Sequence, residues 1–202
     1  INLFVNGETN PIKFDAVIAS APSHVFNGIT EGLEPEYRKK LTEVKYMSAV
    51  LLVLVLDKPL SHVYWLNVAD RSVPFVGVIE HTNLVNSSHY QNNHIVYLSN
   101  YLTKASKYYA MNKDELMAAY SPHLLSINSE FDKSWIRESH HQVIDGAQPI
   151  IGSNYSMKMP AHDTGIPNLY LANTTQIYPE DRGTNYSVMI GRNVARTLHN
   201  NL

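Results

Sequence analysis

The residues that could do chemistry gather near the carboxyl-terminal end, where an irregular loop precedes a helix. The loop reads YPEDRG from Tyr178 to Gly183, and an apolar periodicity typical of a helix follows from about Thr184 to His199. The first four amides of a helix lack intrahelical partners and carry about half a positive charge. Gly183 has no side chain to block a ligand, and Thr184 or Asn185 can cap the helix. The pattern predicts a helix start that meets an anion or an electron-rich group.

A short apolar strand, Asn168 to Ala172, is expected just before this loop. In the helix, Val188, Gly191, Ala195 and Leu198 recur at spacings of three and four, which predicts the stripe that packs on the strand. The small residues in that stripe would let the helix approach the sheet closely. A buried helix after an irregular loop, with no ligand, explains the same residues and stays an alternative.

The rest of the chain is predicted to be mostly β, with two helices. Strands are expected at 1–5, 13–19, 44–56, 63–68, 75–80, 95–101 and 135–143, a turn at Asn6-Gly7, helices at 35–41 and 113–126 with Asn112 as a cap, and an irregular stretch over 145–164. The short strands at the two chain ends are expected to pair with each other, with an antiparallel middle inserted between them. The predicted fold class is therefore α+β, with helices segregated from an antiparallel sheet.

Composition excludes several classes of protein. The 202 residues carry a net charge of −2, which gives no reason to expect nucleic acid as a partner. The sequence has no cysteine, so disulfides, cysteine–zinc sites and thiol nucleophiles are excluded and a reducing, cytoplasmic location is favoured. No apolar run approaches the roughly 18 residues of a membrane span. Ser, His and Asp are present, but the GxSxG pattern of a hydrolase nucleophile is not.

Histidine and carboxylate pairs raise the question of a metal site. Glu80-His81 and His140-His141, with Asp145 nearby, contain residue types that bind metals. Neighbouring residues on a strand point to opposite faces, so each pair offers one ligand to a face, and no HExxH spacing occurs. The sequence therefore predicts no metal site.

The middle of the chain is rich in aromatic residues. These are Tyr64, Trp65, Tyr90, Tyr97, Tyr101, Tyr108 and Tyr109. Aromatic side chains on a sheet can line an apolar cavity, but they are also favoured in ordinary sheet packing. Glu80 and Arg137 lie in predicted strands, where they are either buried pocket groups or residues of exposed faces, and we favour exposed faces.

Three segments resemble the carboxyl-terminal half of the flavin-containing amine oxidase superfamily, to which protoporphyrinogen oxidase-like and phytoene desaturase-like enzymes belong. They are Phe14–Pro22 (FDAVIASAP), Leu169–Thr174 (LYLANT) and Arg182–Ala195 (RGTNYSVMIGRNVA). The resemblance implies that 1–28 and 163–202 form part of a discontinuous FAD-binding α/β domain. It implies that 29–162 form a substrate-binding domain whose sheet roofs the flavin.

The same resemblance implies a cofactor-binding set: Asn173, Thr174, Arg182, Gly183, Thr184 and Asn185. The Asn173–Thr174 region would contact the ribityl-diphosphate of FAD. The amides of Gly183, Thr184 and Asn185 would face the pyrimidine edge of the flavin and stabilise negative charge on its reduced ring. Asn173 stands where the family usually has Gly, and Thr174 stands where it often has Asp. No residue is singled out as a catalytic base.

The phosphate-binding motif GxGxxG is missing, because no two of the nine glycines are two positions apart. The chain also begins at Ile1, without Met. The resemblance therefore implies a fragment of an FAD-dependent oxidoreductase that moves a hydride equivalent from a small-molecule substrate to flavin. Its missing partner would be the amino-terminal FAD-binding segment. Alone, the chain is expected to bind FAD weakly or not at all, to be inactive, and to self-associate through the vacated surface. A cofactor-free binding module with an aromatic sheet and a non-redox flavoenzyme such as a sugar mutase are the alternatives.

Overall fold

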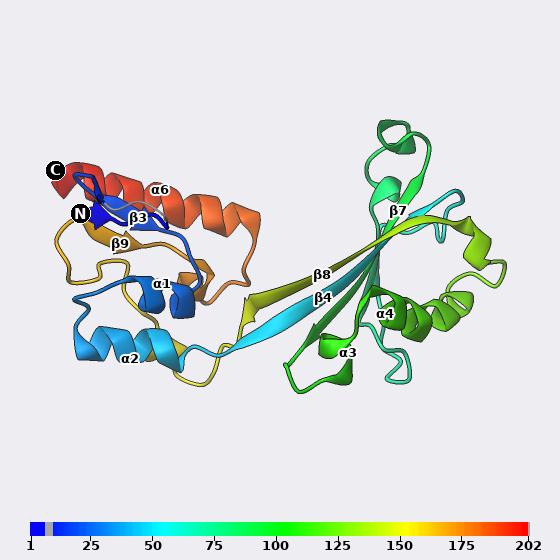
Figure 1. Cartoon of the computed structure of the whole chain (residues 1–202), viewed down its shortest axis with the longest axis horizontal. Helices are drawn as coiled ribbons and strands as arrows, with labels where there is room; N and C mark the ends of the chain where they lie inside the picture. Colours follow the sequence, from blue (N-terminus) through cyan, green and yellow to red (C-terminus); the bar gives the residue numbers. More distant parts are fainter. Residues whose placement is uncertain (7–9, 202) are drawn as a thin grey trace. The chain divides into compact units, whose positions relative to one another are not determined.

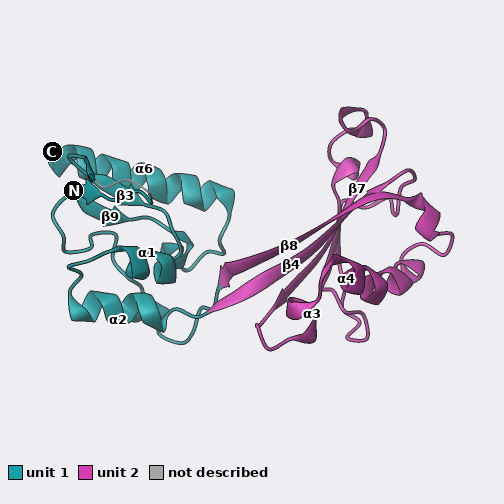
Figure 2. Cartoon of the chain, viewed as in Figure 1, with its two compact units in different colours: residues 1–45, 149–202 teal, residues 46–148 magenta. Residues whose placement is uncertain are grey.

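The computed structural model describes residues 1–6 and 10–201, which form two compact units (Figure 2). Unit 1 comprises residues 1–45 and 149–202, and unit 2 comprises 46–148. Residues 29–45 and 149–162 belong to unit 1, whereas the resemblance implies that 29–162 form the substrate-binding domain. The assignment of one unit to FAD and the other to substrate stays a prediction.

Unit 1 is built round two short parallel strands from opposite ends of the chain. Strand β3 (Val17–Ala19) pairs with β9 (Leu169–Leu171), as expected for the two chain ends. Helices α1 (Ser23–Ile29) and α2 (Pro35–Glu43) cover one face of the pair, and α6 (Thr184–Asn201) covers the other (Figure 1). The result is a three-layer α/β/α arrangement, the usual setting of parallel strands, which are buried on both faces.

A small hairpin completes the amino-terminal part of unit 1. Strands β1 (Asn2–Leu3) and β2 (Ile12–Lys13) pair antiparallel. The predicted turn at Asn6-Gly7 includes Gly7, which lies outside the described residues. Helix α1 was not predicted from the sequence, because Val25 and Gly28 are poor helix formers and no side chain caps it. Its Phe26 is buried against Leu169 and Leu171, so packing rather than helix propensity stabilises it.

The buried face of α6 differs from the predicted stripe. Ile190 and Val194 are its buried residues, whereas Val188 is 50% exposed. A Cβ atom placed on Gly191 would meet nothing within 4 Å, so packing among the described residues does not require a glycine there. The two stripes are adjacent on the helix surface and both are apolar, so periodicity alone could not choose between them.

Unit 2 is a five-stranded sheet with helices on one face. The strand order is β5 (Trp65–Asn67), β6 (Gly77–Glu80), β7 (His94–Leu102), β4 (Tyr46–Leu56) and β8 (Ile136–Pro149). The pairs β5–β6, β6–β7 and β7–β4 are antiparallel, which confirms the predicted α+β class with an antiparallel sheet. The connections between these strands contain short helices: η1 (His81–Asn83) and η2 (Ser87–Tyr90) between β6 and β7, and α3 (Lys107–Ala110), α4 (Lys113–Tyr120), η3 (Ser121–Ser126) and η4 (Lys133–Trp135) between β7 and β8. In unit 1, α5 (Tyr155–Lys158) and η5 (Thr174–Gln176) precede α6.

The core of unit 2 lies between the sheet and α4. Alternate residues of β4 (Val50, Leu52, Leu54 and Leu56) are fully buried together with Leu116 and Tyr120 of α4. Asn112 caps α4 in a capping box with Glu115, as its position predicted. The predicted helix over 113–126 changes to a 3₁₀ helix at Ser121, because Pro122 has no N–H to continue the α-helical ladder. Strand β8 extends to Pro149, through residues expected to be irregular.

Candidate functional site

In unit 1 the parallel strands β3 and β9 have their carboxyl ends side by side, and α/β proteins commonly bind ligands at the carboxyl ends of their strands. The chain leaves β3 through Ala21 and enters α1 at Ser23. It leaves β9 through Asn173 and enters the turn η5. Buried hydrogen bonds join the two exits, since the Ser23 hydroxyl lies 3.2 Å from that of Thr175.

Asn173 is the hub of this junction. Its Oδ1 accepts hydrogen bonds from the amide and the hydroxyl of Thr175, at 3.0 and 2.6 Å. Its Nδ2 donates to the carbonyl of Ala21 at 2.9 Å and to the hydroxyl of Ser23 at 3.3 Å. Because every polar atom of this side chain is engaged inside the chain, Asn173 fixes the shape of the turn. Thr174 is half-buried, and its hydroxyl has no partner among the described residues.

The start of α6 is open. The first helical hydrogen bond runs from the Ser187 amide to the Gly183 carbonyl, at 2.9 Å, so the amides of Thr184, Asn185 and Tyr186 precede the intrahelical ladder. Thr184 and Asn185 are exposed, and Gly183 is half-buried. A Cβ on Gly183 would lie 2.7 Å from Oδ1 of Asn185, the end of a flexible side chain that can move.

The expected cofactor-binding residues thus form two sets. Asn173 and Thr174 belong to the hydrogen-bonded junction, and Gly183, Thr184 and Asn185 form the open helix start. Arg182 is half-buried beside this start, and its amide donates to Asp181 at 2.8 Å. Within the part of the chain that the structure describes, no hydrogen bond joins the two sets. Their binding role stays a prediction.

The outer edge of β3 has no strand partner in the described part of unit 1. The Val17 amide donates to Asn168 and the Ala19 carbonyl accepts from Ala172, so these two residues face β9. Strand geometry then turns the N–H and C=O of Ile18 toward the opposite side. An isolated pair of parallel strands is unusual, because such pairs normally belong to larger sheets. Among the described residues, the backbone groups of Ile18 therefore have no strand partner.

In unit 2 one face of the sheet is not covered by its helices. The register places Trp65, Ile79, Tyr97 and Val53 in one row across four strands, and Asn67, Gly77, Ser99 and Leu51 in the next. Neither row contains a charged residue. Trp65 is 57% exposed, and Tyr101, at 41%, lies on the same face. We call these two rows the open sheet face.

The aromatic residues of the middle are divided between the two faces and the loops. Tyr97 and Trp65 lie on the open sheet face, whereas Tyr108 packs against Tyr120 on the core side, with ring centroids 5.9 Å apart. Tyr90 bonds His81 through its hydroxyl at 2.8 Å. Tyr108 therefore fits the interpretation as ordinary packing, whereas a cavity-lining role for Trp65 and Tyr97 stays a prediction.

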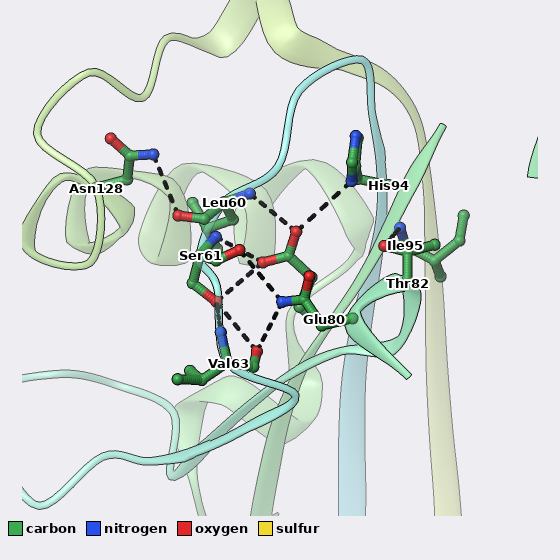
Figure 3. Close-up of polar contacts among 9 residues, drawn as sticks. Leu60, Ser61, Val63, Glu80, Thr82, His94, Ile95 and Asn128 are labelled. Atoms are coloured by element: carbon green, nitrogen blue, oxygen red, sulfur yellow. Dashed lines mark hydrogen bonds and ion pairs between the residues drawn. The ribbon is translucent and has the colours of Figure 1, made fainter. Parts of the chain in front are cut away.

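Glu80 is buried, which corrects the expectation of an exposed strand position. Its side chain is 0% exposed, and its oxygens accept from the amides of Leu60 and Ser61 and from the Ser61 hydroxyl, at 3.1, 2.6 and 3.0 Å (Figure 3). Nδ1 of His94 lies 3.8 Å from the same carboxyl group. The alternation of β6 puts Glu80 on the same side as buried Val78, a signal that was present in the sequence.

The other polar candidates lie at the surface. Arg137 is exposed and forms an ion pair with Asp57 at 3.0 Å. His140 lies 3.5 Å from Glu138, and both side chains are exposed. Among residues 1–6 and 10–201, no group of three or more His, Asp or Glu side chains is placed to hold a metal ion. No helix in the same residues is both long and apolar enough to cross a membrane.

Comparison with known proteins identifies the fold. No protein-family model matches the chain, and no curated protein matches its sequence. Solved structures match its fold. A putative protoporphyrinogen oxidase from Exiguobacterium sp. 255-15 gives a TM-score of 0.66 at 13% identity, over 96% of this chain and 46% of that one. An oxidoreductase from Methanosarcina mazei gives 0.67 at 16% identity, over 98% and 47%.

A third structure has a different activity in its name. A reduced UDP-galactopyranose mutase gives a TM-score of 0.63 at 17% identity, over 80% of this chain and 36% of that one. The chain therefore has the fold of part of these proteins and spans less than half of their length. Two of the three are oxidoreductases by description, and the third is a mutase.

Proposed function

We propose that this chain is part of an FAD-dependent oxidoreductase of the amine oxidase type. The observation that carries the proposal is the architecture of unit 1, which sets an open helix start beside a parallel pair whose outer edge is unpaired. The fold of the whole chain matches about half of a putative protoporphyrinogen oxidase and of an oxidoreductase. An α/β domain with an open edge is what an FAD-binding domain lacking one of its segments would leave.

The helix start would hold the pyrimidine edge of the flavin. The amides of Thr184 and Asn185 lie outside the helical ladder, so they can donate to an acceptor that gains negative charge. Thr184 and Asn185 are exposed, and the end of the flexible Asn185 side chain, which fills the space beside Gly183, can move aside to admit a ligand. The Thr174 hydroxyl would meet the ribityl chain or diphosphate. Bound FAD would accept a hydride equivalent from the substrate, and this chemistry belongs to the cofactor.

A segment carrying GxGxxG would complete the cofactor site. Such a motif follows a strand and opens a helix, and its amides bind the diphosphate. The strand of that segment would pair with β3 at Ile18, whose N–H and C=O face the outer edge. These 202 residues contain no GxGxxG motif, so the segment would come from residues outside them.

The open sheet face would form one wall of the substrate site. It combines aromatic, aliphatic and small polar residues without a charge, which suits an apolar small molecule. Trp65, exposed at one end of the first row, would contact the substrate or the domain that covers it.

Free FAD is expected to bind this chain weakly, with a dissociation constant above about 10 μM, because the donors for the diphosphate are missing. Equilibrium dialysis and flavin fluorescence can measure this constant. The chain joined to a GxGxxG segment should bind FAD tightly at one to one, and its flavin should be reduced by substrate without oxygen. Tight stoichiometric binding to the 202 residues alone would contradict the proposal, as would a joined protein that binds none.

A non-redox flavoenzyme is the second candidate, favoured by the match to a UDP-galactopyranose mutase. A nucleotide-sugar substrate carries a diphosphate, which proteins usually bind with Arg or Lys. The open sheet face has neither among its two rows, which favours the oxidoreductase. A joined protein that isomerises a nucleotide sugar with no net oxidation would decide for the mutase. A cofactor-free module, by contrast, would bind its ligand without any added segment.

A further inference from the structure

An open cleft of about 740 Å³ lies in unit 2, apart from the open sheet face. The loop after β4, the β5–β6 connection and the turn after η3 form its walls. Its apolar lining includes Leu60, Leu66, Val68, Val73, Phe75 and Ile127. These residues belong to or pack on the core cluster under the helices, with Leu60 and Phe75 fully buried, so the cleft is on the side of the sheet that the helices cover.

Hydrogen bonds hold one wall of the cleft in place. The carboxyl group of Glu80 accepts hydrogen bonds from the amides of Leu60 and Ser61 (Figure 3). The Asn128 amide group donates to the Leu60 carbonyl at 3.2 Å, which ties this wall to the turn after η3. Asn83 donates to the carbonyls of Ser61 and Val63, at 3.2 and 2.9 Å. The cleft is therefore largely preformed, as small-molecule sites usually are.

The charge of the lining is one-sided. Asp70 is the acidic residue of the lining. The lining also contains His62, but no Lys, Arg or Glu. Oδ1 of Asp70 accepts from the amide and hydroxyl of Ser72, at 2.8 and 2.7 Å, which fixes the carboxylate in an Asx turn. Its Oδ2 has no partner among the described residues. Asp70 and Arg71 together line a second hollow, which shares Val68, Val73 and Phe75 with the cleft.

We propose that this cleft binds a small organic cation, with an apolar body on the lining and an ammonium group at Asp70. The size of the cleft falls within the range of small-molecule sites, roughly 300–1,000 Å³. A charge-assisted hydrogen bond to the free carboxylate oxygen supplies the orientation. None of the cleft's lining residues belongs to the proposed flavin-binding set, so binding here does not require FAD.

The probes that test this site are 2-(1-naphthyl)ethylamine, cationic at pH 7, and 2-(1-naphthyl)ethanol, its neutral counterpart. Amide chemical shifts of the 202-residue chain are followed during titration with each probe. We expect the amine to shift amides in 59–75 and 126–129, and to bind about threefold more tightly than the alcohol, because only the amine pairs with the carboxylate of Asp70, which is exposed to solvent.

Asp70→Asn keeps the Asx-turn acceptor and removes the charge, so it should abolish the preference for the amine. Asp132→Asn is the matched control, because Asp132 makes the same turn to Ser134, at 2.8 Å, and does not line the cleft. It should leave the preference intact. The proposal is overturned if shifts map elsewhere, if neither probe binds at millimolar concentration, or if Asp70→Asn behaves like Asp132→Asn.

Discussion

Val17→Pro is expected to unfold unit 1, whereas Ile18→Pro, one residue further on, leaves it folded. The Val17 amide donates to the Asn168 carbonyl at 2.9 Å, and this bond is part of the short β3–β9 ladder. Proline removes the donor and places its ring against the partner strand, which strands do not tolerate at a paired position. A core built on three-residue strands has few other ladder bonds to compensate.

Ile18→Pro removes an N–H that faces the unpaired edge, a position where strands tolerate proline. Val17 before it is already extended, so the restriction on the preceding residue is met. Loss of part of the Ile18 side chain, which is 37% exposed, should cost about 1 kcal/mol. If the proposed strand docks there, the same substitution also prevents the GxGxxG segment from pairing with β3.

The two units can be followed separately because both tryptophans, Trp65 and Trp135, lie in unit 2. Tryptophan fluorescence during urea unfolding reports on unit 2, and amide resonances of β3 and β9 report on unit 1. In the Val17→Pro variant, the dispersed amide resonances of β3 and β9 should disappear, whereas the urea unfolding transition of unit 2, followed by tryptophan fluorescence, should be unchanged. Equal destabilisation by the two proline substitutions would mean that the Ile18 edge is not free.

Glu80→Ala should lower the free energy of unfolding of unit 2 by about 3 kcal/mol. The substitution leaves the amides of Leu60 and Ser61 without acceptors, and each unsatisfied buried group costs about 1–3 kcal/mol. The wall of the cleft would also lose its support, so the probes of the preceding section should bind more weakly.

Glu138→Ala is the control for this substitution, because Glu138 is also a strand glutamate and its side chain is 70% exposed. It should change the free energy of unfolding by less than about 0.5 kcal/mol. Urea unfolding followed by tryptophan fluorescence measures both variants. A Glu80→Ala protein as stable as Glu138→Ala would show that the buried carboxyl group is not a structural support.

Elements with strong local signals could be predicted from the sequence. Asn112 and Glu115 fix the start of α4 through a capping box, and the apolar run of β4 has the length and the β-branched residues of a buried strand. The pairing of β3 with β9 followed from the short apolar strands at both chain ends. The resemblance to flavoenzymes agreed with this order of segments, and solved structures match the fold.

Features that depend on tertiary contacts could not be predicted. The prediction of the buried face of α6 was wrong, because the helix has two adjacent apolar stripes. Only packing against the β3–β9 pair selects the stripe with Ile190 and Val194. Strand alternation indicated the buried side for Glu80, but the donors that satisfy its carboxyl group, Leu60 and Ser61, lie about twenty residues earlier in the chain and could not be predicted. The side chain of Asn173 is engaged by Ala21 and Ser23, more than 100 residues away, which no local pattern indicates.

Amide hydrogen exchange at Ile18 tests the central claim that β3 receives a further strand from an FAD-binding segment. In the 202-residue chain this amide should exchange rapidly, because it faces an unpaired edge. In a protein that joins the chain to a GxGxxG segment and holds FAD, we expect its exchange to slow by about 1,000-fold or more. Equally rapid exchange in both proteins, with the Val17 amide protected in each, would contradict the account.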